Sequence, residues 1–371
     1  MSLKSYLLTT LCLLGGLAAP GAVHAGSEAK AVYTQNNSAA GNSVLAYSQN
    51  PDGSLTPGGS YSTGGTGTGS GLGSQGALAI TENHRWLIAV NAGSHTISAF
   101  EIRPSGLVLS DQVWSGGKQP ISVTIDQNLV YVLNAGGAVG GTDNISGFYL
   151  TQKGALLPLA HSTRPLSGAN VAPAQVSFAP SGDHLVVTEK GTNLIDTFAV
   201  NESGLAGWGN FTPSSGMTPF GFAFTPTGFA VVSEAFGGAA GASRLSSYEV
   251  DSTGLPEVVT ASLPTGQNAA CWVVVARNGH FAYVTNTASN TVSGLRVAGD
   301  GTLTLLGSGG VSAQTGATPI DAAVSANSQF LYVLNSGAHS IGSYRIGAMG
   351  ELTWVGDAAG LPAAAVGLVA R

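Results

Sequence analysis

The chain has 371 residues, only 9% of them charged, and its 19 acidic and 13 basic side chains give a formal net charge of −6. No basic stripe is present that could neutralise nucleic-acid phosphates, so nucleic acid is excluded as a partner. The 54 glycines indicate many tight turns. Helical segments with a clear 3.6-residue period are absent after the N-terminal stretch, and this composition predicts an all-β protein.

The first 25 residues predict a secretory signal peptide. Lys4 precedes an apolar run over residues 6–17, and a small-residue cleavage site ends at Ala25. That run is too short for a preferred membrane span, and no later stretch reaches the roughly 18 to 20 apolar residues that a span needs. We therefore expect a signal peptide at 1–25, a single domain at 26–371, and a periplasmic or secreted protein.

Cysteine usage agrees with this expectation. Cleavage after residue 25 removes Cys12 and leaves Cys271 alone in the apolar run AACWVVVA. A lone cysteine cannot form a disulfide framework within one chain, and its apolar neighbours predict a buried, inert thiol. We expect a monomer.

From residue 31 onward, seven copies of one strand pattern follow each other. Each copy has a strand of β-branched and aromatic residues, a turn, a second strand, and a Gly-containing turn into a third, as in FAYVTNTASNTVSGLRV followed by DGTLTLLG at 281–307. The first strands of the copies end at Gln35 or Asn36, Asn91, Asn134, Glu189, Glu234, Asn286 and Asn335. Their spacing of roughly 43 to 56 residues is typical of propeller blades.

One more short apolar run precedes each of copies two to seven. The runs are GALAIT, PISVTID, PAQVSFAP, PFGFAFTP, ACWVVVAR and PIDAAVSA. The first copy has no such run, but the C-terminal PAAAVGLVAR at 362–371 has the same character and should pair with it. The sequence therefore predicts a seven-bladed β-propeller of four-stranded antiparallel blades, closed by the C-terminal strand completing the N-terminal blade.

The Tyr-Val-Thr-Asn of residues 283–286, the seven copies and the DG-x-L hairpins resemble the seven-bladed lactonase superfamily of YVTN-repeat propellers. That superfamily includes propeller-type 6-phosphogluconolactonases, carboxymuconate-lactonising enzymes and surface-layer proteins. The resemblance covers essentially the whole mature chain. It implies an exported lactonase-like protein that hydrolyses or forms a sugar or muconic lactone, as a lactonase or a lactonising cycloisomerase. The alternatives are a non-catalytic propeller that binds a small polar ligand or carbohydrate, and a cell-surface or adhesion module.

The resemblance also implies a site at the axial mouth where inner strands begin and second strands end. Lactonases carry His and Arg there, but this chain has Phe220-Gly221, Gln175 and Ile320-Asp321 at the matching inner-strand starts. Glu234 in VVSEAF matches the Val-x-x-Glu of the family. We therefore interpret Glu234 and its blade neighbour Glu189 as the catalytic candidates, which could share a proton if they are close.

Ligand binding at this mouth is assigned to one cation and several polar side chains. The residues are Lys190, Gln75, Gln119, Gln175, Asn268 and Asp321. In the alternative interpretation Glu189 and Glu234 are solvated rim carboxylates, and the equivalent asparagines cap turns through side-chain to backbone bonds. No cofactor is expected, although the carboxylates of Asp321, Glu189 and Glu234 could hold a hard cation such as Ca²⁺.

The Gly-rich stretch at 58–76 contains GTGTGSGLG. It has neither the preceding parallel strand nor the following helix of a dinucleotide-binding loop, so we predict a flexible loop between blades.

Overall fold

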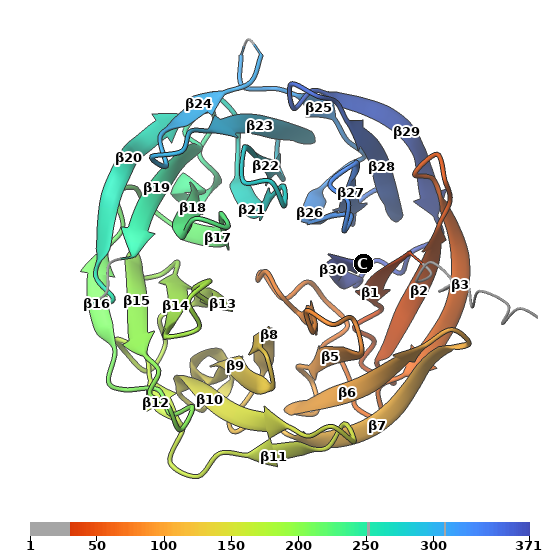
Figure 1. The fold of residues 1–371 in the computed structure, drawn as a ribbon, viewed down its shortest axis with the longest axis vertical. Helices are drawn as coiled ribbons and strands as arrows, with labels where there is room; N and C mark the ends of the chain where they lie inside the picture. Colours follow the sequence, from red (N-terminus) through yellow and green to blue (C-terminus); the bar gives the residue numbers. More distant parts are fainter. Residues whose placement is uncertain (1–29, 251–252, 308) are drawn as a thin grey trace, which may run out of the picture.

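The computed structural model describes residues 30–250, 253–307 and 309–371. The predicted signal peptide at 1–25 lies outside these residues. Within them the strands form seven antiparallel sheets arranged in a ring, and Figure 1 looks down the axis of that ring. The predicted seven-bladed propeller with four-stranded blades is confirmed, and blades 3 and 6 each carry one additional short strand.

Each blade runs outward from the axis. The innermost strands of blades 1 to 7 are β30 (Val366–Ala370), β4 (Leu78–Ile80), β8 (Pro120–Asp126), β13 (Pro173–Phe178), β17 (Pro219–Phe224), β21 (Ala270–Val275) and β26 (Pro319–Val324). The second strands are β1 (Ala31–Gln35), β5 (Trp86–Asn91), β9 (Leu129–Ala135), β14 (His184–Glu189), β18 (Phe229–Glu234), β22 (Phe281–Asn286) and β27 (Phe330–Asn335).

The third strands are β2 (Ser43–Gln49), β6 (Thr96–Arg103), β10 (Asp143–Leu150), β15 (Leu194–Ala199), β19 (Arg244–Val250), β23 (Thr291–Val297) and β28 (Ser340–Ile346). The outer strands are β3 (Leu55–Ser62), β7 (Gly106–Trp114), β11 (Leu156–Pro158), β16 (Asn210–Pro213), β20 (Pro256–Pro264), β24 (Leu303–Leu305) and β29 (Leu352–Ala359). The additional strands are β12 (Arg164–Pro165) and β25 (Ala313–Gln314), and short 3₁₀ helices occur at η1 (Gly136–Val139) and η2 (Phe236–Gly238).

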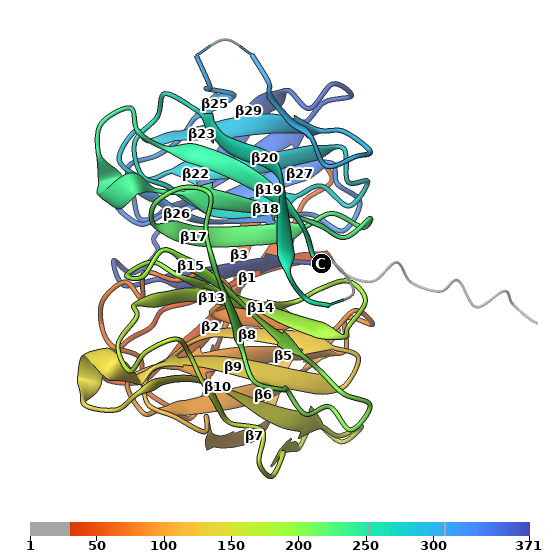
Figure 2. The same ribbon diagram turned by 90° about the vertical axis from the view of Figure 1, so that its left-hand side faces the viewer.

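The C-terminal strand closes the ring as predicted. Strand β30 pairs antiparallel with β1, with Tyr33 opposite Val369 and Thr34 opposite Leu368. The backbone N–H of Arg371 extends the ladder by donating to the carbonyl of Ala31. Figures 1 and 2 show the last strand beside the first, so the free sheet edges of an open ring are absent at the seam.

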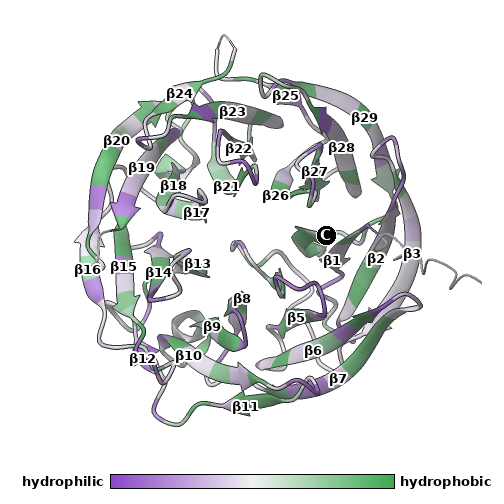
Figure 3. Cartoon of the chain, in the orientation of Figure 1, coloured by the Kyte–Doolittle hydropathy of each residue, from purple (hydrophilic) through white to green (hydrophobic). Residues whose placement is uncertain are grey.

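Adjacent blades pack face to face through their second and third strands. All six residues of β5, β22 and β27 are buried, whereas β29 on the perimeter is mostly exposed or half-buried. Figure 3 shows the mixed hydrophobic and hydrophilic colouring of the outer strands. Because successive side chains of a strand point to opposite faces of the sheet, the apolar side chains of one blade pack against those of the next in a continuous layer.

The glycine of the turn between third and outer strands fixes the spacing between blades. Gly154 has φ +81°, and a Cβ added to it would lie 2.3 Å from the indole of Trp86 in the preceding blade. The same contact recurs at Gly53, Gly301 and Gly350, which lie against Phe330, Phe229 and Phe281 respectively. These glycine turns are therefore packing elements as well as turns.

Candidate functional site

A cavity of about 480 Å³ lies on the propeller axis between the inner strands. Its walls come from β4, β8, β13, β21, β26 and β30, whose aliphatic side chains include Leu78, Val123, Val176 and Leu368. A neighbouring cavity of about 380 Å³ shares Gln75, Gln175 and Arg277 with it. A cavity that combines aliphatic walls with convergent polar side chains is typical of small-molecule sites.

The two ends of this axial cavity differ in exposure. Gln75, Gln175 and Asp321 lie near the inner-strand starts and are at most 8% exposed. Glu82 and Arg277 lie in the turns that follow inner strands at the other end, and both are exposed. The cavity therefore opens where the inner strands end, and we call this the open end.

The opposite end is closed by residues 64–76, which we call the axial plug. The Nε1 of Trp272 donates to the carbonyl of Ser74 at 2.8 Å, and Ser74 Oγ donates to the carbonyl of Ile121 at 2.8 Å. The backbone N–H of Gln75 donates to the carbonyl of Ala174. In Figure 1 this orange segment reaches into the centre of the ring. The prediction of a flexible loop is wrong, because the segment is bonded to blades 3, 4 and 6.

An apolar cluster from blades 4, 5 and 6 fills the same end. Ala174, Phe220, Ala235, Cys271 and Trp272 are all buried, and the rings of Phe220 and Trp272 lie 4.8 Å apart. The thiol of Cys271 is buried as predicted, and burial raises its pKa to about 12. The expected axial mouth is thus placed at the wrong end: its apolar residues and the axial plug seal it.

The two glutamines beneath the plug bond to backbone groups. Gln75 Nε2 donates to the carbonyl of Val273 at 2.7 Å, and Gln75 Oε1 accepts from the N–H of Val273 at 2.9 Å. Gln175 makes the same two-bond contact with Phe222, at 2.9 and 2.8 Å. These side-chain amides form hydrogen bonds with backbone N–H and C=O groups of the inner strands that no neighbouring strand pairs with. They form the floor of the cavity.

The remaining amides lie elsewhere. Gln119 has positive φ, its N–H donates to Nδ1 of His95 at 3.0 Å, and it does not line the axial cavity. Asn268 accepts from the N–H of Gly241 and also lies outside the cavity. Of the predicted ligand-binding residues, the structure brings together Gln75, Gln175 and Asp321 around the cavity.

Lys190 fastens the plug. Its Nζ donates to the carbonyl of Gly73 and lies 4.7 Å from the centroid of the Phe220 ring. Burial lowers the pKa of Lys190 to about 8 because the ammonium is desolvated. Its position on the sealed side separates it from the open end.

Glu189 and Glu234 are fully buried, so their interpretation as solvated rim carboxylates is wrong. Ser246 Oγ and Ser262 Oγ donate to the two oxygens of Glu234, the latter at 2.6 Å. A Cβ on Gly216 would lie 2.0 Å from this carboxylate, so the chain covers it closely. Burial raises the pKa of Glu234.

Glu189 has its own set of donors. The N–H of Ser167 donates to Oε1 at 2.9 Å, and the hydroxyls of Ser167 and Thr192 donate to Oε2. Its carboxyl neighbour is Asp196 on β15 and not Glu234. Neither Glu189 nor Glu234 lines the axial cavity or its neighbour.

The asparagines at equivalent positions explain what these glutamates do locally. Asn91 Nδ2 donates to Ser98 Oγ at 2.8 Å, and Asn286 Nδ2 donates to Ser293 Oγ at 2.9 Å. These are side-chain bonds to the third strand, not the expected side-chain to backbone caps. Glu234 with Ser246 reproduces the arrangement with the donor reversed, so Glu234 replaces Asn as a buried hydrogen-bonding link between the second and third strands.

Asp321 is the carboxyl at the deep end of the axial cavity. Its Oδ1 accepts from the N–H of Ala322 at 2.8 Å, and the backbone of Leu368 also favours its charged form. Burial outweighs these bonds and raises the pKa of Asp321 well above its ordinary value. No basic side chain contributes to this balance. Asp321 can therefore accept or donate a proton inside the cavity.

Sequence reasoning did not identify the groups at the open end. Glu82, His84 and Arg277 all lie in turns directly after inner strands, in the segments TENHR and ARNGH. They were overlooked because the mouth was expected at the other end. Among residues 30–250, 253–307 and 309–371, no three His, Cys, Asp or Glu side chains converge as metal ligands, so Asp321, Glu189 and Glu234 form no such set.

Comparison with known proteins confirms the resemblance to lactonase propellers. Residues 237–362 match the family model described as "Lactonase, 7-bladed beta-propeller". No curated protein matches the chain. No helix in the described residues is long and apolar enough to cross a membrane.

Solved structures share the fold at low sequence identity. A putative 6-phosphogluconolactonase from Bacteroides fragilis has 19% identity and a TM-score of 0.69, with 93% of this chain and 99% of that chain covered. A protein from Lactobacillus plantarum has 19% identity and a TM-score of 0.73, with 92% and 99% covered. The periplasmic gluconolactonase of Pseudomonas aeruginosa has 17% identity and a TM-score of 0.71, with 90% and 97% covered. These likenesses establish the fold.

Proposed function

We propose that this lactonase-like propeller hydrolyses a small, unphosphorylated lactone that enters the axial cavity from the open end. The observation that carries the proposal is Asp321, a buried carboxyl at the deep end of a cavity whose charged rim residues lie at the open end. The family match and the lactonase names of two structural neighbours support this reaction class.

In this proposal Asp321 is the general base. Burial raises the pKa of Asp321, which makes its carboxylate a stronger base toward water than an exposed aspartate. The water oxygen bonds to the lactone carbonyl carbon, and the carbonyl oxygen becomes an oxyanion. When the tetrahedral intermediate collapses, the ring C–O bond breaks and the leaving oxygen takes the proton back from Asp321. The product is the open hydroxy acid.

A hydroxyl in the cavity can stabilise the oxyanion. Thr124 lines the cavity, and its Oγ1 accepts from the N–H of Phe178 at 3.1 Å. The hydroxyl proton of Thr124 therefore remains to be donated to substrate. A donor directed at the developing charge contributes about 3 kcal/mol in comparable sites.

The charges of the cavity favour an unphosphorylated substrate. Arg277 at the rim lines the same cavity as the carboxyl groups of Glu82 and Asp321. A phosphate dianion is normally held by several cations or backbone donors, and Arg277 alone does not balance two carboxylates. A neutral sugar lactone fits the aliphatic walls at lower electrostatic cost.

The test compares two bases in the protein comprising residues 26–371. Glucono-δ-lactone, 6-phosphoglucono-δ-lactone and a muconic lactone are assayed with wild type, Asp321→Asn and Glu234→Gln, the second variant testing the base predicted from the sequence. We expect turnover of the neutral lactone and a loss of about 10² to 10⁴ in kcat for Asp321→Asn alone.

Each other result would contradict part of the proposal. Loss of activity in a folded Glu234→Gln protein, with Asp321→Asn active, would move the base to Glu234. Preference for the phosphorylated lactone would overturn the charge argument. No turnover of any lactone by folded wild type would reject the enzymatic function.

A further inference from the structure

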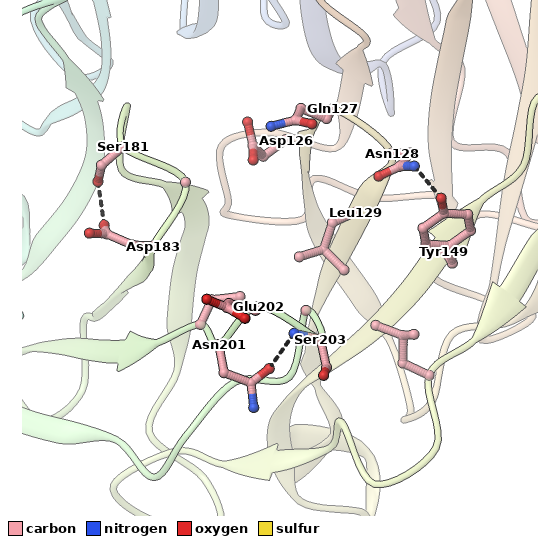
Figure 4. Close-up of a pocket in the computed structure, with 14 residues that line it drawn as sticks. Asp126, Gln127, Asn128, Leu129, Tyr149, Ser181, Asp183, Asn201, Glu202 and Ser203 are labelled. Carbon is pink, nitrogen blue, oxygen red and sulfur yellow. Dashed lines mark hydrogen bonds between the residues drawn. The ribbon is translucent and has the colours of Figure 1, made fainter.

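A second cavity, outside the axis, lies between blades 3 and 4. It has a volume of about 420 Å³ and is formed by three turns together with two further residues. The turns span residues 126–129, 181–183 and 200–204, and Tyr149 of β10 and Leu159 complete the wall. Figure 4 shows polar side chains from these turns around the hollow. No step of the proposed lactone reaction uses this inter-blade pocket.

The polar groups of the pocket are held in place by neighbouring bonds. Asn128 Nδ2 donates to the hydroxyl of Tyr149 at 2.5 Å. Asn201 Oδ1 accepts from the N–H groups of Ser203 and Leu205, both at 3.0 Å, which leaves its amide NH₂ as a donor. His184 Nδ1 contacts Asp183 Oδ1 at 2.9 Å. Such ordering before binding lowers the entropy that a ligand must overcome.

One carboxylate in the pocket has free acceptor atoms. Asp126 is half-buried, and its Oδ2 would lie 2.6 Å from a Cβ on Gly182, so the glycine lets the two turns approach. Among the bonds of the described residues, none ends on the Asp126 side chain. Burial, and then repulsion from Glu82, raises the pKa of Asp126. A hydroxyl donor from a ligand could bond to this carboxylate.

The lining defines the chemical class of the ligand. Carboxylates and amides accept hydrogen bonds from hydroxyl groups, while the ring of Tyr149, 43% exposed, and the side chain of Leu129 offer apolar surface to C–H groups. No Lys or Arg lines the pocket, which disfavours anions. Saccharides combine directed hydroxyls with an apolar ring face. We therefore propose that the inter-blade pocket binds an uncharged saccharide, independently of the axial cavity.

The experiment measures saccharide binding by calorimetry to the protein comprising residues 26–371. The probes are a panel of neutral di- and trisaccharides, a uronic acid disaccharide, and a simple diamine. Variants Asp126→Asn and Tyr149→Ala alter the pocket. Trp354→Ala removes an aromatic side chain that is 61% exposed on β29 of blade 7 and serves as the matched control.

We expect saturable binding of a neutral saccharide, weakened about tenfold or more by each pocket variant and unchanged in Trp354→Ala, where tenfold corresponds to about 1.4 kcal/mol. Asp321→Asn should bind the saccharide normally, which separates this site from the axial one. Absence of saturable saccharide binding would overturn the proposal. So would binding that both pocket variants leave intact, or tighter binding of the diamine or the uronic acid.

Discussion

Replacing Asp196 by serine should stabilise the protein at neutral pH. Asp196 is fully buried on β15, and neither of its carboxyl oxygens has a hydrogen-bond donor. Its neighbour is the carboxyl of Glu189, which adds to the effect of burial in raising the pKa of Asp196. The equivalent third-strand positions of four other blades carry Ser98, Ser146, Ser246 and Ser293. Asp196→Ser gives blade 4 the same hydroxyl.

The magnitude follows from proton linkage. Burial, with Glu189 adding to it, raises the pKa of Asp196 from 3.8 to about 10. Between these two pKa values the unfolded chain releases this proton and the native protein keeps it. The free energy of unfolding therefore falls by about 1.4 kcal/mol per pH unit as pH rises. The full shift corresponds to about 4 kcal/mol at pH 7. Relaxation around the site reduces this value, and we expect a gain of about 2–4 kcal/mol for Asp196→Ser.

Below pH 4 the advantage should vanish, because Asp196 is then protonated in both states. Urea unfolding of wild type and variant, followed by tryptophan fluorescence at pH 4.5, 6 and 7.5, measures the difference in unfolding free energy. Other titrating groups affect both proteins equally and cancel. The reciprocal variant Ser246→Asp places a carboxyl beside Glu234 and should be destabilised increasingly from pH 4.5 to 7.5. A pH-independent difference between Asp196→Ser and wild type would refute the linkage between the two carboxyls.

Three further outcomes test the packing. Gly154→Ala should lose about 2–4 kcal/mol of unfolding free energy, because the added methyl group clashes with Trp86 and positive φ strains the backbone. Gly228→Ala should lose about 1 kcal/mol, because Gly228 has φ +98° but no atom within 4 Å of an added Cβ. Equal urea midpoints of the two variants would contradict this expectation. Removing residues 366–371 should abolish cooperative thermal unfolding by opening the seam with β1, and an unchanged calorimetric transition would show that closure is dispensable. Trp272→Ala should cost about 3–5 kcal/mol and expose the axial plug to limited proteolysis, which an unaltered cleavage pattern would exclude.

The blade order and the closing strand could be predicted from the sequence because both depend on local signals. Alternating β-branched residues, Gly-containing turns and a recurring strand pattern specify one meander at a time. The C-terminal run was recognisable because six other inner strands have the same pattern. The third-strand serines that bond to the asparagines also follow a sequence pattern, because Ser98 and Asp196 each follow the last residue of the second strand at the same interval.

The position of the site could not be read from the sequence, because it depends on contacts between distant segments. Gln75 and Val273 bond across the ring although they are 198 residues apart, and with Trp272 on Ser74 they decide which end is sealed. The burial of Glu234 depends on Ser262 of another strand reaching its carboxylate. Local patterns thus determined the seven blades and their closure, whereas packing across the axis decided that Asp321 faces the cavity and that the cavity opens beside Arg277. Which polar side chains meet, and which meet solvent, is a property of the closed ring.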